Sequence, residues 1–95
     1  MNKYELMFII DPTLTDEQKA TVVETVKGII AEGGEVSDVD EWGMRKLAYP
    51  IQKKNEGFYV VMEFKANPTL PKELDRRMRN SEQIMRHLII NKDEK

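Results

Sequence analysis

The sequence predicts an α+β fold in which two helices cover one face of a four-stranded antiparallel sheet. Three observations support it. Four segments are rich in branched and aromatic residues, two others repeat apolar residues at helical spacing, and their order is strand, helix, strand, strand, helix, strand. Right-handed crossovers then place both helices on the same face of the sheet. The chain of 95 residues is long enough for one domain, spanning residues 1–95.

The first strand and the first helix have the clearest signals. The segment YELMFII, residues 4–10, is mostly apolar at both parities, which is typical of a central strand covered on both faces. Thr15 and Gln18 form a capping-box pattern, and an apolar stripe at helical spacing follows it. We therefore expect a helix over residues 15–32, ended by Gly33–Gly34.

The second strand is predicted to be long and peripheral. Residues 35–49 have mixed polarity, and Pro50 cannot donate to a ladder, so this strand ends there or lies at a sheet edge. Val36 and Val39 differ in parity, so in a regular strand their side chains would point to opposite faces. We expect one extra residue, a bulge at Gly43, to resolve this mismatch of faces.

The second half of the chain repeats the design of the first. IQKKNEG, residues 51–57, is the predicted hairpin loop, and FYVVMEFKA, residues 58–66, alternates as a strand. Thr69 is expected to cap a helix that Asn80 closes, and residues 84–91 form the last strand before a polar tail, KDEK. The arrangement is ferredoxin-like, βαββαβ, with strands one and three central. The alternation predicts that the core-facing side chains of the third strand are Phe58, Val60, Met62 and Phe64.

Charge is unevenly distributed along the chain. The net charge is -2, but residues 1–41 hold three cations against ten acids, and residues 42–95 hold twelve against seven. A polyanion can therefore bind one side of the molecule despite its overall sign. The segment between Trp42 and Asn55 contains no acid. Its four cations are Arg45, Lys46, Lys53 and Lys54.

Enzymatic function is not expected. The chain has no cysteine and a single histidine, His87, which has neither a nucleophilic cysteine nor a second histidine ligand to act with. The glycine pair at 33–34 follows a helix, whereas a phosphate-cradling loop precedes one. We expect no cofactor, metal, membrane or small-molecule substrate, and a cytoplasmic location because no secretory signal opens the chain.

Nucleic acid is the better candidate ligand, with two possible geometries. RNA-recognition modules share this element order and stack bases on aromatics of the open sheet face. The third strand, EGFYVVMEF, resembles their motif only superficially, because Glu56 replaces a cation and Val60 an aromatic. Tyr59 would also stand beside Glu5 and Glu63, which disfavours a stacking platform.

The second geometry is binding at the edge strand and its hairpin. Arg45 and Lys46 are adjacent and would point to opposite faces, as suits a backbone wrapping round an edge. Tyr49 would stack on a base or pack beside Leu47. The alternative is that these cations only guard the edge against aggregation. The protein would then be a ferredoxin-like regulatory or oligomerisation module without an RNA role.

Four segments occur in the same order, and at similar spacing, as in a known family. They are YELMFII, WGMRKLAYPI, EGFYVVMEF and IMRHLI. Over about residues 2–92 the chain resembles the sixth protein of the bacterial ribosomal small subunit. The resemblance implies a ferredoxin-like fold, no catalysis, and an assembly role on the ribosome, in the central domain of the small subunit. Such proteins form a heterodimer with the eighteenth small-subunit protein, and the pair binds a junction in the ribosomal RNA. The implied RNA contacts are Lys3, Tyr4, Arg45, Lys46, Tyr49, Lys53, Lys54 and Arg86.

A second interface is expected on the sheet face that the helices leave open. A basic partner protein would cover apolar side chains there, while acids of residues 35–41 help to steer it. The predicted partner-binding residues are Met7, Trp42, Tyr59 and Val61.

Overall fold

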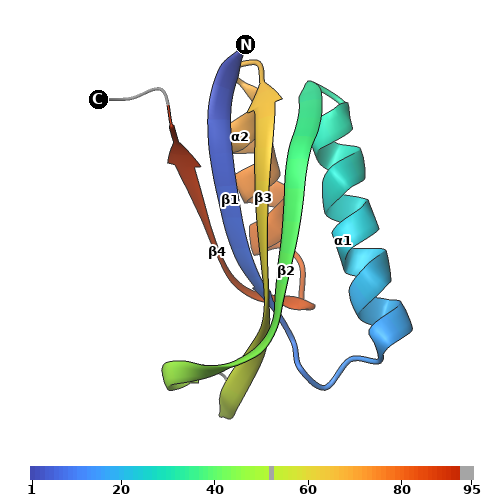
Figure 1. Cartoon of the computed structure of the whole chain (residues 1–95), viewed down its shortest axis with the longest axis vertical. Coiled ribbons are helices and arrows are strands. Elements are labelled where there is room, and N and C mark those ends of the chain that lie inside the picture. Colours follow the sequence, from blue (N-terminus) through green and yellow to red (C-terminus); the bar gives the residue numbers. More distant parts are fainter. Residues whose placement is uncertain (52, 93–95) are drawn as a thin grey trace.

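The structure, a computed structural model, describes residues 1–51 and 53–92. Its elements follow the predicted order, and every pair of neighbouring strands is antiparallel in the sheet order β2-β3-β1-β4. Both helices cover the same face of the sheet (Figure 1). The ferredoxin-like fold is confirmed, with the second strand at an edge. The elements are β1 (Asn2–Ile10), α1 (Asp16–Ala31), β2 (Gly34–Ile51), β3 (Lys54–Ala66), α2 (Leu70–Arg79) and β4 (Ile84–Asn91).

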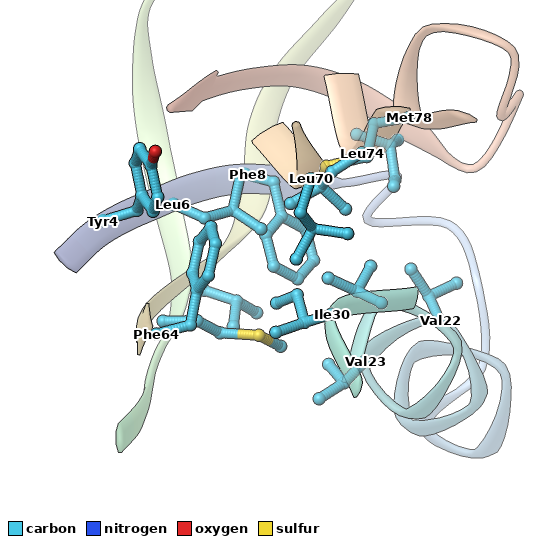
Figure 2. Packing of buried hydrophobic residues seen from close by; sticks show 14 of the residues in the cluster. Tyr4, Leu6, Phe8, Val22, Val23, Ile30, Phe64, Leu70, Leu74 and Met78 are labelled. Atoms are coloured by element: carbon cyan, nitrogen blue, oxygen red, sulfur yellow. The ribbon is translucent and has the colours of Figure 1, made fainter. Parts of the chain in front are cut away.

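One hydrophobic core lies between the sheet and the helices (Figure 2). Alternate residues of β1 and β3 lie opposite each other on this face, so Tyr4 pairs with Phe64 and Leu6 with Met62. Val60, Met62 and Phe64 are buried as predicted, and Phe58 is partly buried against the same cluster. The helices contribute Val22, Val23, Val26, Ile30, Leu70, Leu74 and Met78.

The two helices begin differently. Thr15 caps α1 with the predicted box: its N–H donates to Gln18 Oε1 at 2.9 Å, and its Oγ1 accepts from the Gln18 N–H at 3.1 Å. Thr69 occupies the N-cap position of α2 but makes no side-chain cap bond, so its predicted capping role is wrong. Its backbone is helical, at φ -84 and ψ -20, whereas a capping residue needs extended backbone to aim its oxygen at the first turn.

The second glycine of the pair after α1, Gly34, allows close packing. Gly34 opens β2 opposite Ala66, and a Cβ placed there would lie 2.1 Å from the Lys65 carbonyl oxygen. The helix ends at Ala31 with Glu32 as its C-cap. Only a residue without a side chain lets the two backbones approach this closely.

β2 departs from a regular ladder in three places. The predicted irregularity at Gly43 is present as a register shift between Glu41 and Gly43, with φ +83 at the glycine. The parity mismatch of Val36 and Val39 has another cause, because the register already shifts between Val36 and Asp38. That attribution to Gly43 was wrong, and a third shift follows Lys46.

The connection between β2 and β3 is shorter than predicted. Ile51 pairs with Lys54, and residues 54–57 belong to β3 instead of a loop over 51–57. The turn contains Lys53 in the left-handed region, at φ 65. Gln52 of the predicted loop, and residues 93–95 of the predicted tail, lie outside the described residues.

Candidate nucleic-acid interface

The hairpin end of β2 and β3 extends past the other strands (Figure 1). We call residues 44–51 and 53–57 the arm. β1 pairs with β3 only as far as Phe58, so the arm is a two-stranded ribbon. Its ladder is also interrupted, since after the pair Lys46↔Glu56 the next is Ile51↔Lys54. A two-stranded ribbon is at best marginally stable alone.

Arg45, Lys46 and Lys53 carry the unpaired positive charge of the arm. All three are exposed, and none forms an ion pair with an acid of the described residues. Arg45 lies opposite Gly57 and Lys46 opposite Glu56 in the register, so the two side chains leave opposite faces of the ribbon. This arrangement can hold phosphates on both sides of the arm.

Tyr49 and Arg86 meet although they are 37 residues apart. The Arg86 guanidinium donates to the Tyr49 hydroxyl and also lies 5.9 Å from the centre of its ring. The distal part of β2 thus reaches β4 across the sheet. Arg86 is therefore part of the arm's surroundings, and Tyr49 contacts an arginine and stays exposed.

Lys54 differs from the other arm cations. Its Nζ lies 3.1 Å from Asp11 Oδ2, and the two side chains are only 29% and 17% exposed. Its charge is already paired with that of Asp11, whereas the charges of Arg45, Lys46 and Lys53 are not paired with an acid of the described residues.

Lys3 and Tyr4 lie at the end of β1 remote from the arm. Tyr4 is 5% exposed, and its ring stacks on Phe64 with centroids 5.4 Å apart. A buried ring has no face available for a base, so Tyr4 belongs to the core. Lys3 is exposed and lies opposite Lys65 in the register.

The expected partner-binding residues all contribute to the open face of the sheet. Val61 lies opposite Met7 in the register, and Tyr59, two residues before Val61, lies opposite Ile9. The Trp42 ring stacks on Tyr59 at 6.3 Å between centroids, with an angle of 8° between the planes. Its indole N–H donates to Asp40 Oδ2 at 2.9 Å, which orients the ring. Trp42 remains 46% exposed.

Sequence reasoning missed two residues of this face. Leu88, opposite Met7, is 51% exposed, and Ile90, opposite Glu5, is 45% exposed. The sequence could have identified them, because Leu88 and Ile90 alternate with Arg86 along IMRHLII and alternate residues of a strand share a face. The apolar part of the open face therefore extends across β4.

Acids border this apolar surface. Asp38, Glu63 and Glu5 lie in one cross-strand row, and Asp40 follows beside Val61. The Lys92 ammonium, 2.8 Å from Glu63 Oε1, lowers the pKa of that carboxyl below its ordinary value. The open face thus carries acids on both sides of its apolar part, with Lys3 and Lys65 in the next row, and basic side chains near Arg86 and the arm.

His87 lies on the covered side of β4. Its Nε2 is 2.6 Å from Asp75 Oδ1, and the hydrogen bonds that Asp75 makes with His87 and Arg79 lower the pKa of this carboxyl. The pair joins α2 to the sheet. The described residues contain no group of ligands that could hold a metal ion, and none of the described helices is long and apolar enough to cross a membrane.

Nearly the whole chain, arm and open face included, matches one protein family. Residues 3–91 match the family model of ribosomal protein S6. The chain belongs to the ribosomal protein S6 family. The predicted resemblance is thereby confirmed, and with it a non-enzymatic structural role as a small-subunit ribosomal protein.

Individual family members align over almost their full length. The chain is 55% identical over 92 residues to the small ribosomal subunit protein bS6 of Clostridium acetobutylicum, covering 96% of this chain and 97% of the relative. It is 51% identical over 92 residues to that of Clostridium novyi, with the same coverage. The crystal structure of 30S ribosomal protein S6 from Thermotoga maritima superposes with a TM-score of 0.91 at 39% identity, covering 96% of this chain and 87% of that one.

Proposed function

We propose that the protein binds the central domain of the small-subunit ribosomal RNA through its arm, while its open face pairs with the eighteenth small-subunit protein. Together these contacts make it an assembly component of the small subunit. The proposal joins membership of the ribosomal protein S6 family to the placement of charge on the described residues.

The observation that carries the RNA part is the set of three exposed cations on a protruding ribbon. Arg45, Lys46 and Lys53 have no acid partner among the described residues, so no internal ion pair must break when a phosphate approaches. Positive charge prevails at this protruding end, where Glu56 is the one acid, and such an excess attracts a polyanion even when the net charge is -2. Tyr49 and Arg86 lie beside them and can contact the same strand of RNA.

The open face supports the protein part. Trp42, Leu88 and Ile90 together expose apolar surface, and Asp38 and Asp40 border it. Apolar surface rimmed by charge is typical of protein interfaces, and the acids favour a basic partner. The same acids repel RNA, which separates the two binding surfaces.

The salt dependence of binding tests the RNA part. Each neutralised phosphate contributes about -0.9 to the slope of log affinity against log salt, so three contacts give about -3. Replacing Arg45 and Lys46 by glutamine should reduce the magnitude of this slope by about two. Lys72→Gln, which removes a charge from the helix face, is the matched control and should leave the slope unchanged. The measurement is fluorescence anisotropy of transcribed small-subunit RNA across a salt series.

Binding that does not depend on salt would refute the RNA part. Native copurification tests the whole proposal, because the protein should migrate with small subunits and retain the eighteenth protein. An oligomerisation module without an RNA role would instead sediment apart from ribosomes.

A further inference from the structure

The contact between Asp11 and Lys54 joins the turn end of the arm to the body of the protein. Asp11 follows β1 and is held from three directions. Its Oδ1 accepts from the Thr13 N–H at 2.9 Å and from Thr13 Oγ1 at 2.7 Å, and its own N–H donates to the Gln83 carbonyl at 2.9 Å. Its Oδ2 accepts from Lys54 Nζ at 3.1 Å. Asp11 is thus a fixed point at the junction of β1 and β4, to which the first residue of β3 is attached.

The arm needs such an attachment because its backbone ladder is incomplete. Between the pairs Lys46↔Glu56 and Ile51↔Lys54, residues 47–50 lie opposite Asn55 alone. The ladder therefore does not determine the direction of the arm by itself. Among the described residues, two polar side-chain contacts join the arm to the rest of the protein, Lys54 to Asp11 and Tyr49 to Arg86.

Lys54 is poorly placed to bind a phosphate. It is 29% exposed, and its charge is balanced by Asp11 at contact distance. A phosphate could take Lys54 only by displacing a carboxylate that is itself held in place. Burial raises the pKa of Asp11, but the hydrogen bonds from Thr13 and Lys54 outweigh it and keep the pKa below its ordinary value. The carboxylate therefore remains charged at neutral pH.

We infer that Asp11 is a positioning residue for RNA binding, which acts through Lys54 by holding the arm in its binding orientation. The inference rests on the proposed function. It has an unusual consequence, since an acid then contributes to the affinity for a polyanion. An arm released from its attachment would have to be ordered on binding, which opposes association.

The variant Asp11→Asn tests the inference with little disturbance of the fold. Asparagine keeps one side-chain oxygen for Thr13 and loses the charge that faces Lys54. We expect about threefold to tenfold weaker binding to transcribed small-subunit RNA, with a salt slope no smaller than that of the wild type. Simple electrostatics predicts the opposite sign, because removing an acid strengthens binding to RNA. Affinity equal to or tighter than wild type would overturn the inference.

Three further variants isolate the mechanism. Glu17→Gln removes an exposed acid from α1 and should leave affinity unchanged or slightly higher. Lys54→Gln should weaken binding as much as Asp11→Asn without reducing the slope, whereas a slope smaller by about one would identify Lys54 as a phosphate contact and overturn the inference. The double variant should bind no more weakly than either single variant, since both remove the same contact.

Hydrogen exchange supplies a readout independent of RNA. Amides of residues 53–57 should exchange faster in Asp11→Asn, while those of the central strands stay protected. Unchanged exchange in the arm would count against the inference. Failure of the wild type to bind RNA in a salt-dependent manner would instead refute the proposed function, so the two failures are distinguishable.

Discussion

The two ends of the β2–β3 ribbon are held by different forces. At the body end, Gly34 pairs with Ala66 and Val36 with Phe64, and both β3 residues are almost completely buried. At the arm end, the same strands lie beyond β1 and are held by side-chain contacts such as that between Lys54 and Asp11. At the body end, a third strand and the helices fix the ribbon by burying its side chains. At the arm end, most side chains are exposed, so unpaired charges can be placed there without a desolvation cost.

The largest effect should come from removing a buried side chain at the body end. Phe64→Ala deletes a ring that is 1% exposed and stacked on Tyr4, so we expect a loss of about 3–5 kcal/mol in the free energy of unfolding. Tyr49→Ala, an aromatic truncation in the arm, should cost about 0.5 kcal/mol or less. Urea denaturation monitored by circular dichroism measures both. Similar losses in the two variants would abolish the distinction between the ends.

An intermediate effect is expected at the boundary between body and arm. Gly57 is buried, and a Cβ added there would lie 2.2 Å from Ile9 Cγ2, which belongs to a side chain only 4% exposed. Gly57→Ala should therefore destabilise the protein by about 1–3 kcal/mol, because Ile9 must move within packed surroundings. Thermal unfolding measures the change. Gly28→Ala, with open space around the added methyl, is the control and should stabilise α1 by about 0.5–1 kcal/mol.

The smallest effect should come from ion pairs near the body end, where they supplement a core. Hydrogen bonds from Arg76 and Arg77 lower the pKa of Glu73 from 4.5 to about 2. Between these two pKa values, Glu73 is protonated in the unfolded chain and charged in the folded chain. Its ion pairs therefore stabilise the fold fully above about pH 4.5, and this stabilisation is lost as the pH falls toward 2.

Glu73→Gln tests this pH dependence. The stability difference between the variant and the wild type should shrink on acidification through that range, as measured by urea denaturation at several pH values. A constant difference would show that Glu73 contributes through packing and not through its charge.

The element order and the inward faces were predictable because they depend on local periodicity. Alternation along residues 58–66 identified Val60, Met62 and Phe64, and the capping box identified the start of α1. Thr69 has the right residue type for a cap but sits in helical backbone, which its own identity does not reveal. The predicted hairpin loop over residues 51–57 is too long, because pairing with β2 keeps residues 54–57 in a strand.

The candidate interfaces were predictable only in part. The sequence predicts the positive charge of the arm. Whether an individual cation is paired depends on residues far away along the chain. Lys54 meets Asp11 across 43 residues, and Arg86 meets Tyr49 across 37. The RNA contacts themselves remain predictions.

By itself the sequence determined which segments form strands and helices, which side chains are apolar enough to build the core, and where positive charge accumulates. Only the tertiary structure decided which of those charges stay unpaired, how the arm is attached, and which apolar side chains remain on the open face. The physical reason is the range of the interactions. Periodicity and capping act within a few residues, whereas ion pairs and exposure depend on which distant segments the fold brings together.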